Sequence, residues 1–111
     1  MSINPDTELL KHMLDETTFI LNHTENITRE DYLSNEVLCR ASIRSLEIIG
    51  EATKKLSEVF KNSHPGIEWK KIAGTRDKLI HDYYGIDYEI VWDIITSKNQ
   101  ELHQFLKSNG A

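Results

Sequence analysis

Apolar residues recur at the three- and four-residue spacing of an α-helix along almost the whole chain, and this periodicity restricts the possible folds most strongly. No stretch shows the strict alternation of apolar and polar residues that a half-buried strand requires. Only five glycines and two prolines occur among the 111 residues, so few positions interrupt a helix. A chain of this length can bury one hydrophobic core. The sequence therefore predicts an all-α fold, with a single domain over residues 1–111.

Local signals predict the ends of the first three helices. Asn4 followed by Pro5 is a suitable N-cap and first-turn pair for a helix over residues 5–24. Thr28, with Asp31 three residues later, predicts a capped short helix that runs through Leu33. A proline-free segment over residues 36–60 follows, and we expect it to be the central helix of the bundle. The expected inward-facing stripes of the first and third helices are Leu10, Met13, Leu14, Thr17 and Leu21, and Leu38, Ala41, Ser45, Ile49, Ala52, Leu56 and Val59.

The second half of the chain contains one clear interruption, at residues 61–66, where a proline and a glycine disfavour a continuous helix. Residues 67–84 then have the pattern of a helix that could bend at Gly74. Asp87 can cap a last helix that ends at Asn109 and Gly110. Four substantial helices with short connections predict an up-down bundle. The expected stripe of the last helix is Tyr88, Val91, Trp92, Ile95, Leu102, Phe105 and Leu106.

Charge is distributed unevenly along the chain. The 18 acidic and 13 basic side chains give a net charge of −5, which argues against a protein that coats nucleic acid. Residues 61–81 nevertheless carry five basic and two acidic side chains, whereas the segments on either side are acidic. A solvated helix face would explain this cluster, and so would a site for an anionic ligand. The basic side chains of the segment are Lys61, Lys70, Lys71, Arg76 and Lys78.

Arg76 occupies an unusual position in this basic segment. At about 100° per residue it falls in the middle of the apolar face of its helix. Because an unpaired buried charge costs several kcal/mol, Arg76 needs a carboxylate, a subunit interface or an anionic ligand. Glu47 and Glu51 could pair with it, in a charged stripe that also holds Arg40 and Arg44. The apolar residues around Arg76 are Trp69, Ile72, Leu79, Ile80 and Tyr83.

His81 is the best candidate for acid-base chemistry. Asp77 lies one helical turn before it, so the carboxylate could orient the imidazole and favour its protonated form. An exposed histidine in an ordinary surface pair is the simpler alternative. No histidine follows a glutamate by three residues, so we expect no carboxylate-bridged metal site.

The composition also bears on where the protein acts. Cys39 is the single cysteine, so the chain cannot form an internal disulfide, and we expect Cys39 to be a small core residue. The N-terminus lacks the basic and apolar regions of an export signal, and no apolar run approaches the roughly 20 residues of a membrane span. We therefore expect a cytoplasmic protein.

Several segments together resemble one family. Residues 76–83 match the R-x-x-x-x-H-x-Y signature of the HepT-like toxins, which are part of the HEPN ribonuclease superfamily. Residues 44–52 are similar to the R-x-x-E-x-x-G-E-A helix of that family, and Pro65, Trp69 and Ile72 stand at its usual offsets. Asp77 departs from the pattern, because this position is commonly asparagine in these proteins. The resemblance extends over nearly the whole chain.

This resemblance implies a homodimeric four- to five-helix bundle of HEPN type that acts as a metal-independent endoribonuclease. The RNA 2′-hydroxyl would be the nucleophile, so no metal or cofactor is implied. His81 would be the general acid or base, and Arg76 would stabilise the transition-state charge, with Asp77 beside it. The residues expected to bind RNA are Lys70, Lys71 and Lys78, and those expected to form supporting ion pairs are Arg44, Glu47 and Glu51.

The resemblance also implies a partner. In type VII toxin-antitoxin systems of this kind, an MntA-like nucleotidyltransferase antitoxin transfers AMP to the motif tyrosine, which corresponds to Tyr83. Tyr84 is adjacent and remains an alternative acceptor. A different function would fit the same helices: a non-catalytic module that only binds a nucleotidyltransferase. A helix-turn-helix regulator is disfavoured by the acidic segments on either side of the basic one and by the absence of a basic recognition helix with base-reading side chains.

Overall fold

A computed structural model describes residues 5–81 and 85–109, with the backbone alone at positions 76, 80 and 81. The described residues form seven α-helices and no strand, so the predicted all-α class is confirmed. The helices are α1 (Pro5–Thr24), α2 (Arg29–Leu33), α3 (Glu36–Lys55), α4 (Glu58–Ser63), α5 (Trp69–His81), α6 (Tyr88–Thr96) and α7 (Lys98–Ser108).

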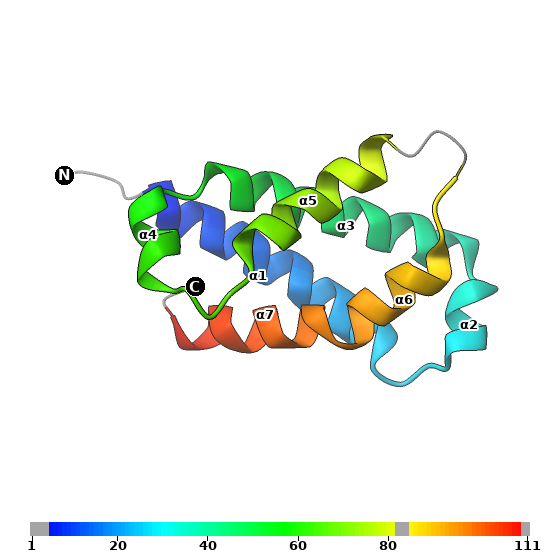
Figure 1. Ribbon diagram of the computed structural model, residues 1–111. Helices are drawn as coiled ribbons and strands as arrows, with labels where there is room; N and C mark the ends of the chain where they lie inside the picture. Colours follow the sequence, from blue (N-terminus) through cyan, green and yellow to red (C-terminus); the bar gives the residue numbers. More distant parts are fainter. Residues whose placement is uncertain (1–4, 82–84, 110–111) are drawn as a thin grey trace.

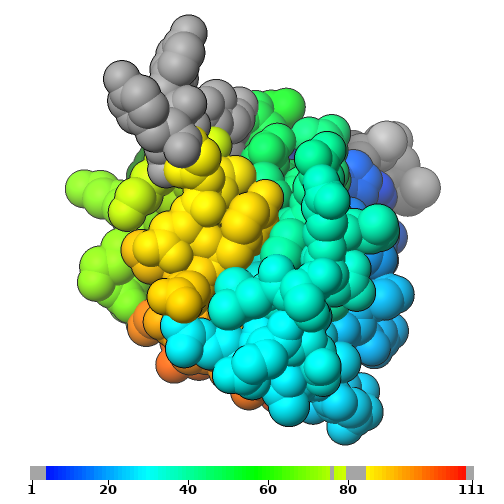
Figure 2. Space-filling view, turned by 90° about the vertical axis from the view of Figure 1, so that its right-hand side faces the viewer, coloured from blue at the N-terminus to red at the C-terminus, as the bar shows by residue number. Residues whose placement is uncertain are grey.

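The long helices pack side by side and alternate in direction, as an up-down bundle requires. Helix α1 lies between α3 and α7, and α5 crosses the other side of α3 (Figure 1). Helices α6 and α7 follow each other along one side of the bundle. The short helix α2 closes one end, where it contacts α3 and α6 (Figure 2). An ion pair of 2.9 Å between Arg29 and Glu89 joins α2 to α6 at this end.

Capping side chains begin several of these helices where the sequence predicts them. Thr28 and Asp31 form a reciprocal capping box at the start of α2, with both hydrogen bonds at 3.1 Å. Asp87 caps α6 by accepting from the backbone N–H groups of Glu89 and Ile90. The first helix begins and ends where the sequence predicts, because α1 runs from Pro5 to Thr24.

The predicted continuous helix over residues 36–60 is wrong, because the chain breaks after Lys55. Leu56 is extended, with φ −60° and ψ 144°, and it is buried. Ser57 then caps α4 by accepting from the Phe60 N–H at 3.1 Å. The hydroxyl and backbone N–H of Ser57 both donate to the carboxylate of Asp6 in α1, at 2.6 and 2.9 Å. This contact between distant segments stabilises a cap in the middle of a helical pattern.

Two further expectations change because of this break. Val59 does not belong to the inner stripe, since 77% of its surface is exposed. The predicted interruption at residues 61–66 starts too early, because α4 continues to Ser63. The connection that precedes α5 therefore covers residues 64–68.

The last predicted helix is interrupted at Ser97, where α6 ends and α7 begins. The Ser97 hydroxyl donates to the Asp93 carbonyl at 2.7 Å, and the Thr96 hydroxyl donates to the Trp92 carbonyl at 2.9 Å. Such bonds compete with the helical backbone pattern and bend helices. The inward stripe continues across the interruption through the buried residues Val91, Ile95, Leu102 and Leu106.

The core lies along α1 and α3. Met13 and Ile20 of α1 are fully buried, whereas the predicted Leu21 is only half-buried. Tyr32 of α2 is also fully buried, its ring 5.2 Å from that of Trp92 and its hydroxyl 2.7 Å from Ser42 Oγ. Cys39 is buried in the core, as expected. In the part of the chain that the structure describes, no helix combines the length and the apolar character needed to cross a membrane.

Candidate active site

Helix α5 carries the sequence motif, and its first residue anchors it to the bundle. Trp69 is buried, and its Nε1–H donates to the carbonyl of His64 at 3.0 Å. Its ring contacts those of Phe60 and Phe105, with centroids 5.9 and 5.7 Å away. Aromatic rings packed edge to face in this way hold a helix start firmly in place.

The apolar face of α5 points towards the core, as the helical spacing predicts. Ile72 and Leu79 are half-buried and pack against the core residues. The backbone of Arg76 lies four residues after Ile72 and three before Leu79, so its Cα is on the same face of the helix. His81 is the last residue of α5. The side chains of Arg76 and His81 lie outside the described part of the chain. Tyr83 and Tyr84 lie outside it as whole residues.

Asp77 forms an ion pair with Lys54, which links α5 to α3. Both side chains are partly exposed, at 44% for Asp77 and 37% for Lys54. The sequence indicates Asp77 as a neighbour of His81 but contains no signal for Lys54. The two residues are 23 positions apart, and only the packing of α3 against α5 brings them together.

The predicted ion-pairing residues of α3 lie together on one side of that helix. Arg44 pairs with Glu47 at 3.5 Å, and Lys55 pairs with Glu51 at 3.7 Å. These four side chains line a cleft of about 200 Å³ between α3 and α1, to which α1 contributes His12. Sequence reasoning did not select His12, because no pattern along the chain relates it to α3.

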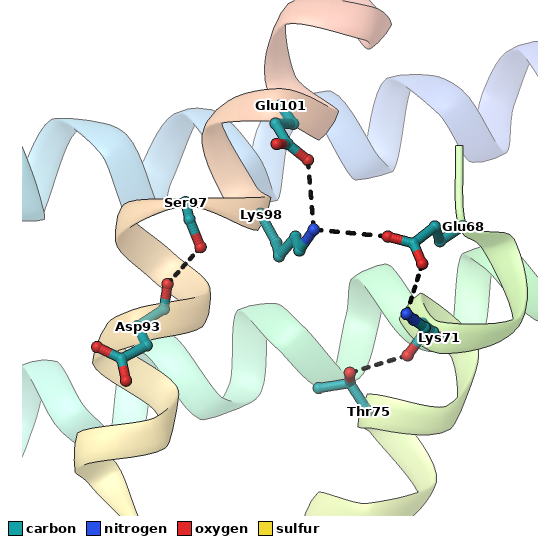
Figure 3. Close-up of polar contacts among 7 residues, drawn as sticks. All are labelled: Glu68, Lys71, Thr75, Asp93, Ser97, Lys98 and Glu101. Carbon is teal, nitrogen blue, oxygen red and sulfur yellow. Dashed lines mark hydrogen bonds and ion pairs between the residues drawn. The ribbon is translucent and has the colours of Figure 1, made fainter. Parts of the chain in front are cut away.

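The three lysines expected to bind RNA are all exposed on α5, but one of them has a close anionic partner. Lys71 Nζ lies 2.6 Å from Glu68 Oε2, and the other oxygen of Glu68 lies 3.5 Å from Lys98 Nζ of α7 (Figure 3). Lys98 also approaches Glu101, at 3.8 Å. The hydrogen bond and charge of Lys71 lower the pKa of Glu68, and Glu68 raises the pKa of Lys71 in return. Glu68 therefore offsets part of the positive charge of the basic segment.

The network around Glu68 lines a second, more apolar groove of about 230 Å³ between α5 and the junction of α6 with α7. Glu68, Lys71, Lys98 and Glu101 contribute its charged side chains, and Asn99 is a buried polar residue on it. The apolar residues that line it are Leu46, Ile49, Ile67, Ile72, Ile94 and Leu102. Within the described residues, no group of three histidine, cysteine or acidic side chains could hold a metal ion.

Comparison with known proteins assigns the chain to a family. The family model described as Ribonuclease HepT-like matches residues 13–108, which include the whole of α3 and α5. The chain belongs to the HepT-like ribonuclease family of the HEPN superfamily. This membership confirms the resemblance that the motif indicates.

Several named relatives match this HepT-like chain over most of its length. It is 46% identical over 98 residues to "Putative RNase TTE0752" of Caldanaerobacter subterraneus subsp. tengcongensis, with 88% of each chain covered. It is 46% identical to "Putative RNase MJ0127" of Methanocaldococcus jannaschii, over 82% of this chain and 72% of that protein. It is 40% identical to "Probable ribonuclease HepT" of Thermococcus cleftensis, over 79% and 80% of the two chains. No solved structure matches it significantly.

Proposed function

We propose that this HepT-like chain is a metal-independent endoribonuclease and the toxin of a toxin-antitoxin system. The observation that carries the proposal is the placement of Arg76 and His81 in one helix, α5, within the segment that the ribonuclease family model matches. Trp69 fixes the start of this helix against the core, which gives the motif a rigid support.

The proposed chemistry needs only groups of the chain and of RNA. His81 accepts a proton from the RNA 2′-hydroxyl or donates one to the leaving 5′-oxygen, while the 2′-oxygen attacks the adjacent phosphorus. Arg76 stabilises the negative charge that builds on the phosphate oxygens. Asp77 directly follows Arg76 and lies one helical turn before His81, so it would contribute a carboxylate to the same site. The products are a 2′,3′-cyclic phosphate and a free 5′-hydroxyl.

The geometry of α5 favours a site shared by two chains. Arg76 and His81 are five residues apart, so their Cα positions are about 140° apart around the helix axis. One helix therefore directs them to different sides. In the proposed homodimer, two α5 helices face each other across a cleft, and each supplies a part of the site.

RNA binding is assigned to Lys70, Lys71 and Lys78, which are exposed along α5. They would contact the phosphate backbone, which makes binding sensitive to salt. Arg44, Glu47 and Glu51 would support the site through ion pairs on α3, the helix against which α5 packs.

Control by an antitoxin completes the proposal. An MntA-like nucleotidyltransferase in the same cytoplasm would transfer AMP from ATP to the hydroxyl of Tyr83, with release of pyrophosphate. Tyr84 is the alternative acceptor. The added phosphate would repel RNA close to Arg76 and block the cleft.

Cleavage of a labelled RNA by the purified, unmodified chain tests the nuclease function. Arg76→Ala and His81→Ala should abolish cleavage, and a chelator should leave it unchanged. Arg40→Ala and His23→Ala are matched controls, because both side chains are exposed and lie outside the proposed site. An RNA with a 2′-deoxy group at the cleaved position should resist the enzyme. Absence of cleavage at any concentration would favour the non-catalytic module that binds a nucleotidyltransferase.

The proposed regulation has a separate test. The chain is co-expressed with the product of the neighbouring gene, which the proposal expects to be a nucleotidyltransferase, and its intact mass is measured. We expect whole AMP additions, located by peptide mapping on the segment that holds Tyr83, together with loss of cleavage. Tyr83→Phe should stay unmodified and active. If the Tyr83→Phe variant is modified on Tyr84 instead, Tyr84 is the acceptor. If the mass of the wild type is unchanged, the proposed AMP transfer is wrong.

A further inference from the structure

Two groups of contacts hold α5 against the bundle. One is in the first half of the helix, residues 69–73, and the other is in the second half, residues 75–81, which carries the motif and is called the motif half. The first half is anchored by Trp69, through its hydrogen bond to the His64 carbonyl and its contacts with Phe60 and Phe105. Glu68, directly before the helix, adds the ion pair with Lys98 of α7. These anchors all lie at or before the first turn of α5 and leave the motif half to other contacts.

In the motif half, Asp77 forms an ion pair with Lys54 of α3, which joins this half of the helix to the bundle. Leu79 adds apolar packing on the core side of the helix. Apolar packing is non-directional and tolerates small rotations, whereas an ion pair with hydrogen-bond geometry restricts the rotation of the helix about its axis.

Gly74 separates the two halves. A Cβ at this position would meet no atom within 4 Å, so close packing does not require glycine here. Glycine weakens a helix interior because its backbone has more freedom in the unfolded state. We therefore expect the anchors at Trp69 to constrain the motif half less well than they would through a helix without this glycine.

We infer that Lys54 is a positioning residue, which sets the orientation of the motif half of α5 through Asp77. Asp77 directly follows Arg76 and precedes His81 by one turn, so a rotation that Lys54 prevents would move both. This inference rests on the proposed ribonuclease function. It also gives a physical reason for the aspartate at this position. The carboxylate of Asp77 carries the negative charge that pairs with Lys54, whereas an asparagine side chain is neutral.

Because the Lys54–Asp77 pair is partly exposed, its effect on the position of the motif can be distinguished from its effect on stability. Ion pairs with this much solvent access contribute little to folding. Catalysis is more sensitive, because a displacement of about 1 Å at a reacting group can reduce the rate by about a hundredfold. Loss of Lys54 should therefore lower activity far more than it lowers the melting temperature.

The experiment compares Lys54→Met with Lys54→Arg in RNA cleavage. We expect Lys54→Met to reduce kcat by about tenfold or more, with KM within about twofold of the wild type. Lys54→Arg keeps the charge and should restore kcat to within about threefold. Lys11→Met is the matched control, because Lys11 is an exposed, ion-paired lysine of α1 far from the motif in sequence.

A double-mutant cycle tests whether Lys54 acts through Asp77. In an Asp77→Asn background the pair is already lost, so adding Lys54→Met should change kcat by less than about twofold. Any of three results would overturn the inference. They are a wild-type kcat in Lys54→Met, a kcat in Lys54→Arg as low as in Lys54→Met, and fully additive effects of Lys54→Met and Asp77→Asn on kcat.

A structural measurement tests the role of Lys54 even if the proposed ribonuclease function is wrong. If the wild type cleaves no RNA, backbone amide resonances of residues 76–81 still decide the structural role of Lys54. We expect them to shift in Lys54→Met and to stay in place in Lys11→Met. Unshifted resonances in Lys54→Met would overturn the positioning role whatever the activity.

Discussion

At the residue scale, Tyr32 shows how a polar group is accommodated in this core. The Ser42 hydroxyl donates to the Cys39 carbonyl at 2.8 Å, so the Tyr32 hydroxyl is the donor in its 2.7 Å contact with Ser42. Burial raises the pKa of Tyr32. Tyr32 therefore stays neutral and donates at all physiological pH values.

Tyr32→Phe should lower the free energy of unfolding by about 1 kcal/mol, because it removes one buried hydrogen bond and keeps the ring. Tyr32→Ala should cost about 3–5 kcal/mol, because it also leaves a cavity beside Trp92. Urea unfolding of both variants measures the difference. Equal losses in the two variants would contradict the assignment of most of the stabilisation to ring packing.

His103 gives the core a pH dependence. Its Nδ1 lies 3.1 Å from Thr17 Oγ1, and burial lowers its pKa, with a smaller contribution from the charge of Lys107. The unfolded chain therefore binds a proton at a pH where the folded chain does not, so stability falls as the pH drops through the ordinary histidine value, near 6.5.

Between about pH 7.5 and about pH 5, the free energy of unfolding should decrease more steeply for the wild type than for His103→Gln. Lys107→Gln should flatten the wild-type dependence slightly, since it removes the smaller cause. Chemical denaturation across this pH range measures these slopes. A His103→Gln chain with the wild-type slope would refute the prediction.

At the element scale, two glycines with different backbone conformations have different roles. Gly74 lies inside α5, where a side chain would meet no neighbour. Gly85 has φ 108°, a conformation that residues with a Cβ rarely adopt.

Gly74→Ala should stabilise the fold by about 0.5–1 kcal/mol, because alanine loses less backbone entropy in a helix. Gly85→Ala should destabilise it by about 1 kcal/mol or more, because the positive φ is strained with a Cβ. Thermal unfolding of the two variants provides the comparison. A destabilised Gly74→Ala would show that α5 needs flexibility at this position for packing.

The helix ends show which local signals can be read from the sequence. The capping box at Thr28 and the cap at Asp87 are local, because the side chain and the N–H groups it binds are within three residues. The break at Leu56 and Ser57 is not local, because Asp6 binds Ser57 from 51 residues away. Periodicity alone therefore predicts one long helix where the fold has α3 and α4.

At the scale of the whole molecule, charge should control the interaction with RNA. The net charge is −5, but the basic segment over residues 61–81 includes all three lysines assigned to RNA. Glu68 holds Lys71 at 2.6 Å, so this lysine must leave its partner, or share it, to contact a phosphate.

Lys70→Ala should make the slope of log affinity against log salt shallower by about 0.7, the value for one phosphate contact with a single strand. Lys71→Ala should change the slope less, and Glu68→Gln should tighten binding because it frees Lys71. Fluorescence anisotropy with a non-cleavable RNA at several salt concentrations measures these effects. Equal slopes for the two lysine variants would contradict a restraining role for Glu68.

The sequence by itself determined the helical class, the family and the position of the motif, because these depend on periodicity and on residues close together along the chain. Only the tertiary structure decided which distant residues meet. Lys54 reaches Asp77, His12 joins the α3 cleft, and Glu68 bridges to Lys98 because helices far apart in sequence pack side by side. Side-chain contacts of this kind depend on helix rotation and spacing, which no local pattern specifies.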